Sequence, residues 1–474
     1  LYNFLQDKIK QIFIISKPTY KLRSKLQQSL IILLHLAFAH IKYFLMKYPT
    51  IDQSLFVLNR KNFTNNLKNN SLAIFNSSDE FPRSGDQSFV FKQNPDLFYL
   101  SGIDQEQTIL LLYPDCPNPL YREVLFLRQT NDYIKVWEGY KYTKEEAISV
   151  SGIKNIQWTP NFDSLLKTLI YSANHLYLTN NEHLRNASVV QTQNARLGNT
   201  IRNTYPNHAI GRLAPILSDL RMQKEPEELQ ALQVACDITN KGFRRVLNFT
   251  KPGVTEYEIE AEFIHEFTRN RSEGFAYTPI IASGANACVL HYIDNALPCK
   301  NGDMLLLDVG ASYANYNADM TRTIPVNGRF SPRQKQVYQA VHAVLNYATE
   351  IMQPGVYWVD YQKEVERFME GQLIDLGLFS RADVEKQNSA NPLFKKYFMH
   401  GVAHHLGLDV HDVWDKYKPF QEGMVLTCEP GIYIQEEGLG IRLENNLVIQ
   451  SGTNFNLMKN IPLDWEEIED LMNQ

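Results

Sequence analysis

The chain has 474 residues and a formal net charge of −5, with 44% hydrophobic and 21% charged residues. This length is too great for one ordinary core and predicts two domains, while the composition is that of a globular protein. The weak acidity and the lack of a concentrated basic stripe argue against a nucleic-acid partner. Five scattered cysteines show neither metal-ligand nor disulfide spacing. They favour a reducing compartment, and we expect a cytoplasmic protein.

The first 45 residues differ from the rest of the chain. Basic residues precede an apolar run at residues 30–39 that ends in Ala-Phe-Ala, as the core of a signal peptide does. The run is much shorter than the ~20 residues that span a membrane, so we expect no membrane partner. The basic residues lie well inside the chain, and Met46 precedes the first globular-looking sequence. We interpret residues 1–45 as a non-native or dispensable extension rather than an export signal.

Residues 46–215 alternate short apolar runs with polar helical stretches, which predicts an α/β domain. The predicted strands are residues 72–75, 108–113, 123–127 and 175–179, and the predicted helices are residues 144–152 and 161–173. No cluster of side chains in this predicted domain indicates a catalytic or metal-binding site. For its aromatic residues, Trp137 included, packing is the default expectation.

A repeated helical pattern opens the second predicted domain, residues 216–474. A long helix with Pro226 in its first turn stops at a Pro-Gly-Val tripeptide, and Thr255 caps the next helix. About a hundred residues later, Ser331 caps a helix that also stops at Pro-Gly-Val, before a further helix over residues 360–376. Each pair of helices joined by Pro-Gly-Val is followed by a predicted β-hairpin that carries acidic residues. The pattern predicts an internal structural repeat whose two halves face a central cleft.

Each hairpin carries a pair of carboxylates. The pairs are Asp308 with Asp319 and Glu429 with Glu444. Each pair is directly opposed if the first turn centres on residues 313–314 and the second on residues 436–437, which places the Cβ atoms ~5 Å apart. Carboxylates this close in apolar strands repel one another unless a cation lies between them. The pattern therefore predicts a pair of divalent metal ions and a metal-dependent hydrolase.

Histidines supply candidate nitrogen ligands and proton carriers. Four of the twelve histidines fall within twelve positions, namely His400, His404, His405 and His411. Clustering favours a site but does not by itself identify the metal ligand, and His291, after a glycine-containing turn, is a further candidate. An oxygen-rich ligand set suits Mn²⁺ and related ions more than a thiolate-bound Zn²⁺. The four carboxylates and one histidine make only five ligands. Five ligands are few for two ions, so some carboxylates should bridge the ions.

These motifs resemble a known family. FMHGVAHHLGLDVHD, LLLDVG, NADMTRT, LTCEPGIYI and GIRLENN are similar to motifs of the M24 metallopeptidases of pita-bread fold, and residues 77–105 resemble the first domain of aminopeptidase P. The resemblance runs from Met46 to the C-terminus and rests on five motifs in the family's order. It implies an α/β N-terminal domain and an α+β pita-bread catalytic domain with a pseudo-twofold internal repeat.

The resemblance also implies roles for individual residues. The implied metal ligands are Asp308, Asp319, His404, Glu429 and Glu444, with Asp319 and Glu444 bridging two divalent ions. Glu429 would also accept the proton of the attacking water. His291 and His411 would flank the scissile carbonyl, His400 would support them, and Arg442 would support the Glu444 hairpin. Trp137 matches, loosely, a position that in the family can reach a neighbouring subunit's site.

The leading hypothesis is an aminopeptidase with two metal ions, most simply Mn²⁺, that removes an N-terminal residue preceding proline. Its partner would be a peptide with proline at the second position, and we expect a homo-oligomer, either a dimer or a tetramer. A prolidase, which cleaves Xaa-Pro dipeptides only, is the nearest alternative. A methionine aminopeptidase fits less well, since it needs no domain such as residues 46–215. A non-catalytic binding protein of the same fold is disfavoured because all five implied ligands are present.

Overall fold

The computed structural model describes residues 48–183 and 189–474. The interpretation of residues 1–45 as an extension lies outside these residues. Within the described ranges, no helix is both long and apolar enough to cross a lipid bilayer.

The amino-terminal part is built on a mixed six-stranded sheet. Its strands, in spatial order, are β6 (Asn155–Trp158), β5 (Glu123–Leu127), β4 (Ile109–Leu112), β1 (Ser71–Asn76), β7 (His175–Leu178) and β8 (Ala209–Arg212). The helices are α3 (Gln53–Thr64), α4 (Pro95–Ser101), α5 (Asp132–Glu138), α6 (Lys144–Ser151), α7 (Phe162–Ser172), α8 (Gln193–Thr204) and α9 (Ala214–Met222). All four predicted strands and both predicted helices are confirmed within one or two residues.

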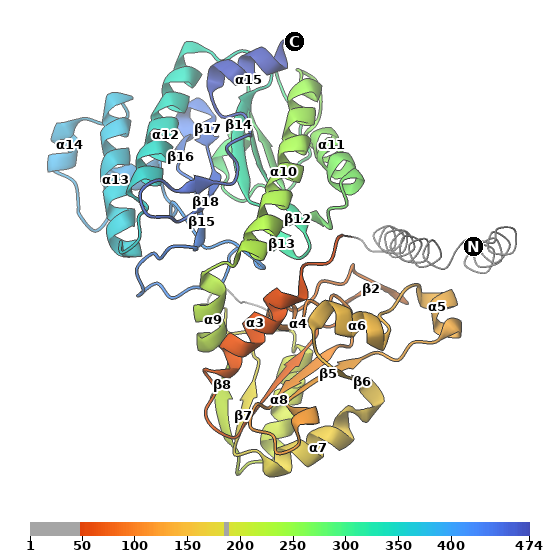
Figure 1. The fold of residues 1–474 in the computed structure, drawn as a ribbon. Helices are drawn as coiled ribbons and strands as arrows, with labels where there is room; N and C mark the ends of the chain where they lie inside the picture. The colour runs from red at the N-terminus through yellow and green to blue at the C-terminus, as the bar shows by residue number, and fades with distance from the viewer. Residues whose placement is uncertain (1–47, 184–188) are drawn as a thin grey trace, which may run out of the picture. The chain divides into compact units, whose positions relative to one another are not determined.

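Helices cover both faces of this sheet (Figure 1). Ile74 of β1 belongs to the apolar cluster that includes Leu166 and Ile170 of α7. The next residue of β1, Phe75, points to the opposite face and meets Phe63 of α3, with the two ring centroids 5.4 Å apart. The strand therefore buries both of its faces, which explains why β1 reads as a continuous apolar run rather than an alternating one.

The carboxyl-terminal part contains the second pattern. Its main helices are α10 (Pro226–Phe249), α11 (Glu256–Arg269), α12 (Pro332–Ile351), α13 (Trp358–Asp375), α14 (Arg381–Glu385) and α15 (Trp465–Met472). Its strands are β9 (Gly274–Phe275), β10 (Ile280–Ser283), β11 (Met304–Val309), β12 (Ala311–Tyr313), β13 (Tyr316–Asn317), β14 (Met320–Pro325), β15 (Val425–Cys428), β16 (Gly431–Ile434), β17 (Leu439–Arg442), β18 (Asn445–Val448) and β19 (Phe455–Asn456). The predicted caps are present, since Thr255 and Ser331 each form a capping box.

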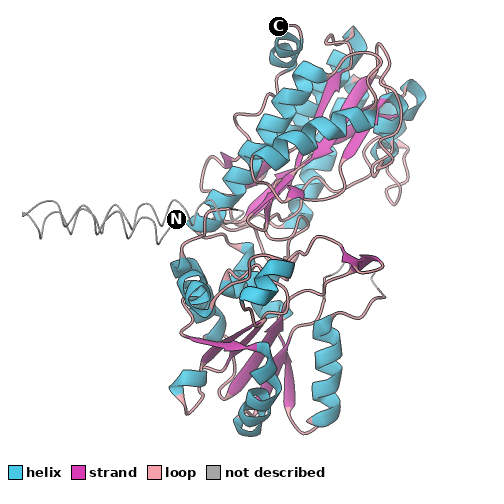
Figure 2. Cartoon of the chain, turned by 90° about the vertical axis from the view of Figure 1, so that its right-hand side faces the viewer, coloured by secondary structure: helices cyan, strands magenta, loops and turns pink. Residues whose placement is uncertain are grey.

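The internal repeat is visible in matching backbone contacts. The N–H of Gly253 donates to the carbonyl of Cys299, and the N–H of Gly355 donates to the carbonyl of Phe420, both at 2.8 Å. Asp308 lies nine residues after Cys299, and Glu429 lies nine residues after Phe420. Helices α10 and α11 pack together, as do α12 and α13, and the strands lie between the two pairs in Figure 1. Figure 2 shows strands of this part packed against helices. Each half thus delivers one carboxylate pair to the centre.

The predicted register of the aspartate hairpin is wrong. Ala314 and Asn315 both have positive φ, at 50° and 65°, as in the two-residue turn that matches the twist of a hairpin. The turn therefore centres one residue later than predicted, and Asp308 pairs with Thr321 instead of Asp319. Asp319 remains on the same face as Thr321 because side chains alternate along a strand. The two aspartates are diagonal neighbours rather than directly opposed.

The predicted register of the glutamate hairpin is confirmed. Cys428 pairs with Asn445 and Gly431 pairs with Arg442, so Glu429 and Glu444 fall opposite each other. The turn contains residues 435–438, as expected. Neither glutamate lies inside a strand. Glu429 lies between β15 and β16, and Glu444 lies between β17 and β18. Both therefore fall where the pairing of β15 with β18 ends and the pairing of β16 with β17 begins.

The packing interpretation of Trp137 is wrong. Trp137 is 74% exposed, and Val136 beside it in α5 is 80% exposed. The helix has no buried residue. These side chains therefore belong to the surface of the described chain.

Candidate metal centre

The two carboxylate pairs converge because the hairpins of the two halves are hydrogen-bonded together. The N–H of Glu444 donates to the carbonyl of Thr321 at 3.0 Å, and the hydroxyl of Thr323 donates to the carbonyl of Arg442 at 3.0 Å. Asn446 holds the backbone of Asp319 from the other half, through bonds of 3.1 and 2.6 Å to its N–H and its carbonyl. The site is thus fixed by backbone contacts between residues more than a hundred positions apart.

The histidine-rich loop is attached to the edge of β15. The N–H of Thr427 donates to the carbonyl of His404, and the N–H of His404 donates to the hydroxyl of Thr427. The imidazole Nδ1 of His404 lies 3.0 Å from the carbonyl oxygen of His405. A carbonyl only accepts, so Nδ1 carries a hydrogen and Nε2 is the nitrogen that faces the carboxylates. Nε2 lies 3.3 Å from Asp319 and 3.6 Å from Glu429.

Ligand atoms of Asp319, His404 and Glu444 all lie within 4.8 Å of one another. Asp308 joins the group through Tyr277, whose hydroxyl is 2.5 Å from both Asp308 Oδ1 and Asp319 Oδ1. Glu429 joins it through His404. All five predicted ligands therefore meet in one place, in buried or half-buried positions.

The clustered carboxylates of this site favour the binding of a cation. Burial raises the pKa of Glu444 well above its usual range, and the neighbouring carboxylates of Asp319 and Glu429 raise it further. Burial likewise raises the pKa of Glu429 to about 7, despite the opposing effect of His404. Glu444 Oε1 is buried and has no hydrogen-bond partner among the described residues. An unpartnered carboxylate oxygen, close to an imidazole nitrogen that itself faces two carboxylates, is part of a ligand set that fits divalent ions such as Mn²⁺ or Zn²⁺.

A chain of hydrogen bonds runs along one side of the site. Arg442 donates to Asp308 Oδ2 at 2.5 Å and to the hydroxyl of Tyr433 at 2.8 Å. Nε2 of His400 lies 2.8 Å from that hydroxyl, and Nδ1 of His400 lies 2.8 Å from the carbonyl of Gly401. Nδ1 is therefore the protonated nitrogen, and Nε2 accepts from Tyr433. Burial and the nearby Arg442 charge lower the pKa of His400 to about 4, so this imidazole is neutral.

Two further candidate histidines, His411 and His291, lie at the surface of the site. The ring of His411 is exposed and meets the ring of His404, with centroids 4.5 Å apart. His291 is exposed in the turn after β10, and its charge is among those that lower the pKa of His400. Both side chains are accessible to a substrate, which distinguishes them from His404.

Comparison with known proteins agrees with this geometry. The profile of Metallopeptidase family M24 matches residues 230–451, and that of the Aminopeptidase P N-terminal domain matches residues 56–177. The Xaa-Pro aminopeptidase of Haemophilus influenzae is 32% identical over 417 residues, covering 85% of this chain and 94% of the relative. The chain belongs to the M24 metallopeptidases, in the aminopeptidase P group. Like the members it resembles, this M24 chain is a metallo-aminopeptidase.

Solved structures extend the match to the whole fold. Escherichia coli aminopeptidase P with the inhibitor Pro-Leu superposes with a TM-score of 0.79 at 30% identity, covering 90% of this chain and 99% of that one. A zinc-substituted form of the E. coli enzyme in complex with product gives a TM-score of 0.80 at 29% identity. The pita-bread fold predicted from the sequence is therefore confirmed for this M24 chain.

The structure adds residues to the site that the sequence did not reveal. Tyr277 bridges the two aspartates, Tyr433 links Arg442 to His400, and Thr321 donates to Glu444 Oε2 at 2.7 Å. Thr321 could have been found, because it lies two residues after Asp319 on the same face of one strand. Tyr277 had no such signal, since it lies 31 positions before Asp308 in a segment without regular structure.

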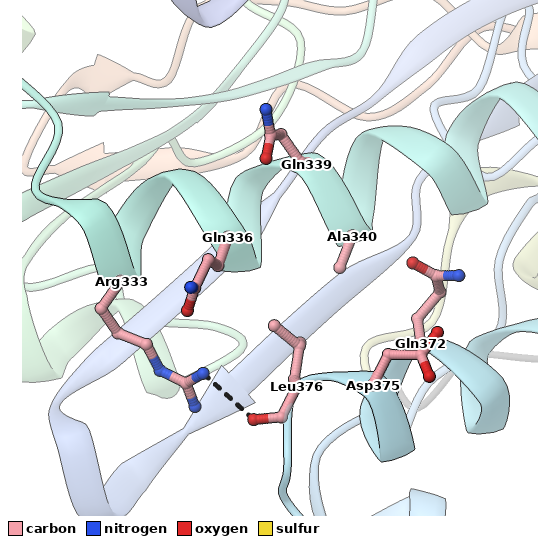
Figure 3. A pocket seen from close by; sticks show the side chains of 7 residues that line it. All are labelled: Arg333, Gln336, Gln339, Ala340, Gln372, Asp375 and Leu376. Atoms are coloured by element: carbon pink, nitrogen blue, oxygen red, sulfur yellow. Dashed lines mark hydrogen bonds between the residues drawn. The ribbon is translucent and has the colours of Figure 1, made fainter.

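The site has one close backbone approach. A Cβ added to Gly310 would lie 1.8 Å from the carbonyl oxygen of Ala318, the residue before Asp319. Only glycine lets the strand carrying Asp308 pass so near the segment carrying Asp319. The pocket in Figure 3 is elsewhere, between α12 and α13, and none of its seven lining residues is a predicted site residue.

Proposed function

We propose that this protein hydrolyses the peptide bond between an N-terminal residue and a proline at the second position. The observation that supports this most strongly is the cluster of Asp319, His404 and Glu444, whose ligand atoms lie within 4.8 Å of one another. Asp308 is linked to this cluster through Tyr277 and Glu429 through His404, and Glu444 Oε1 has no hydrogen-bond partner among the described residues. The Xaa-Pro aminopeptidases that this chain resembles carry the same activity in their names.

Two divalent ions would be held by the five converging side chains. The proposed ligands are Asp308, Asp319, His404, Glu429 and Glu444, with Asp319 and Glu444 shared between the ions. When bound, such a pair activates a water for attack and stabilises negative charge on the substrate's carbonyl oxygen. We propose Mn²⁺ as the resident ion because oxygen ligands dominate the set.

The protein's own groups supply proton transfer and orientation. Glu429, which is also a proposed ligand, is the proposed acceptor of the proton released by the attacking water. His291 and His411 are exposed at the site, where they can donate hydrogen bonds to the scissile carbonyl and carry a proton to the departing proline nitrogen. His400 is a neutral acceptor for the hydroxyl of Tyr433, and Arg442 fixes the orientation of Asp308.

Several further assignments are part of this proposal. Domain limits of 46–215 and 216–474 are supported by the two family profiles, each of which falls inside one range. A cytoplasmic location is supported by the five cysteines, all of which are free and buried. A homo-oligomer, dimer or tetramer, is supported by the apolar surface that α5 exposes around Trp137.

The deciding experiment compares substrates of different length. Metal-depleted protein is reconstituted with Mn²⁺ and offered an Xaa-Pro dipeptide and the matching Xaa-Pro-Yaa tripeptide. We expect release of the first residue from the tripeptide at a higher kcat/KM than from the dipeptide. Cleavage of the dipeptide alone would identify a prolidase, and no cleavage of either peptide would refute the proposal. Pro-Leu, an inhibitor in the E. coli structure, should compete with the tripeptide.

A further inference from the structure

The loop that carries His291 is held by packing contacts and hydrogen bonds at several residues, although His291 itself is exposed. The loop comprises residues 284–297, between β10 and the turn before β11. Its first part, the short helix at residues 284–288, packs against β17, so closely that a Cβ on Gly440 would lie 2.3 Å from the carbonyl oxygen of Ala287. Strand β17 ends in Arg442, so the base of the loop rests on the same scaffold as the metal centre.

A single buried carboxylate organises this loop. Glu256, in the first turn of α11, has no exposed surface. Its Oε1 accepts from the N–H of Ser283 at 2.9 Å and from the side-chain amide of Asn286 at 3.2 Å. Its Oε2 accepts from the hydroxyl of Tyr292 at 2.7 Å and from the N–H of Leu297 at 2.8 Å. The contacts come from both sides of His291, including the residue directly after it.

These four donors satisfy both oxygens of the carboxylate. Hydrogen bonds to an ionised acceptor are shorter and stronger than neutral ones, and a buried carboxylate requires several of them in the absence of a cation. The start of the loop, its tip and its end are therefore all hydrogen-bonded to one side chain on α11. Because α11 is a fourteen-residue helix packed against α10, this point is rigid.

We propose that Glu256 is a positioning residue for His291, holding the loop so that the exposed imidazole faces the metal centre. The inference rests on the role proposed above for His291, and Glu256 itself touches neither substrate nor metal ligands. A loop histidine free to move by about 1 Å would lose on the order of 100-fold in rate, since transition-state contacts depend on such placement.

The test uses Glu256→Gln in the full-length protein. Glutamine keeps the size but has one acceptor oxygen and an NH₂ group, so at least one buried N–H of the loop loses its acceptor. Glu258→Gln is the matched control, because Glu258 lies on the same helix but is exposed, and its side chain accepts hydrogen bonds from Thr255 and not from the loop in the part of the chain that the structure describes. Tyr292→Phe removes the hydroxyl that donates to Glu256 and also contacts the backbone of Ala296, and it serves if the first variant does not fold.

We expect Glu256→Gln to lower kcat/KM by about 100-fold and Tyr292→Phe by about tenfold, with two metal ions retained in both. Glu258→Gln should stay within about twofold of the wild type. The decisive measurement is the double variant with His291→Ala. If Glu256 acts through His291, the double variant should be no slower than His291→Ala alone, since coupled residues are not additive.

Other outcomes distinguish a wrong role for His291 from a wrong role for Glu256. Normal turnover by His291→Ala would refute the role proposed for that histidine. A slow His291→Ala together with a wild-type rate in Glu256→Gln and Tyr292→Phe would refute the positioning role of Glu256 alone. A double variant whose loss equals the product of the two single losses would also refute it, because Glu256 would then act on general stability. Affinity for Pro-Leu, measured by calorimetry, should fall equally in His291→Ala and Glu256→Gln.

Discussion

Replacement of Asp412 by asparagine should be among the most destabilising single changes in this protein. Asp412 lies at the centre of a buried ionic cluster, one residue after His411. Its Oδ1 accepts from Arg221 at 2.6 Å and its Oδ2 accepts from Lys224 at 2.8 Å. The side chains of Asp412 and Lys224 are each only 1% exposed, and that of Arg221 is 4% exposed. The cluster holds the end of the loop that carries His404.

The magnitude follows from what the variant leaves behind. Asparagine can accept from one of the two cations, but its NH₂ group must then face the other. Among the described residues, Lys224 keeps the carbonyl oxygen of Arg221 as its hydrogen-bond acceptor and the more distant charge of Glu228, while Arg221 keeps Asp96 and Asp409. Breaking a buried ion pair from one side costs about 3–5 kcal/mol, because the remaining charge is buried without compensation. We expect a loss of this size in the free energy of unfolding.

The same carboxylate predicts a pH dependence. Burial tends to raise the pKa of Asp412, but Lys224 and Arg221 outweigh burial and hold the pKa at about 2. The unfolded chain has a pKa of about 3.9 for aspartate. The stability that ionised Asp412 supplies is therefore present above about pH 4 and is lost as the pH falls through about 2. The asparagine variant should lack this part of the acid transition.

The assay is guanidinium unfolding followed by tryptophan fluorescence, since Trp414 lies 5.9 Å from His405, ring to ring, beside the cluster. Asp409→Asn is the control, because Asp409 contacts the same Arg221 but is 39% exposed. It should cost less than about 1 kcal/mol. Equal midpoints for Asp412→Asn and wild type, with unchanged slopes, would refute the reasoning that this ion pair is integral to the fold.

Three further outcomes are expected. Chelation should abolish hydrolysis and added Mn²⁺ or Co²⁺ should restore it, so full activity in protein free of metal by elemental analysis would contradict the proposed mechanism. His404→Ala should lose one ion as well as rate, whereas His291→Ala and His411→Ala should keep two ions and lose about 2.7–4 kcal/mol of transition-state stabilisation. Two ions in the first variant, or fewer in the others, would show that the histidine roles are misassigned. Gly310→Ala should lower metal affinity and stability together, because its Cβ would displace the segment before Asp319. Wild-type metal binding by that variant would show that the close approach can relax.

Much of the fold could be predicted because its signals are local. Pro226 at the start of α10, the capping boxes at Thr255 and Ser331, and the continuous apolar run of β1 each determine an element through contacts among near neighbours. The glutamate hairpin was also predictable, since a Gly438 with positive φ closes its turn in the expected place. The aspartate hairpin was not, because Ala-Asn is a weak signal for a turn that needs two positive φ angles.

The proposed metal-binding side chains were predicted from the sequence pattern together with the family resemblance, whereas their arrangement was decided by tertiary structure. Four carboxylates in apolar sequence contexts already indicate a cation, because burial of unpaired charge is costly wherever those segments lie. Which oxygens converge depends on bonds such as those from Glu444 to Thr321 and from Tyr277 to Asp308, between segments distant in the sequence. The anchoring of His291 by Glu256 and the exposure of Trp137 have the same origin. Local sequence determines the conformation of a few consecutive residues, but only the packed chain determines which distant groups share one environment.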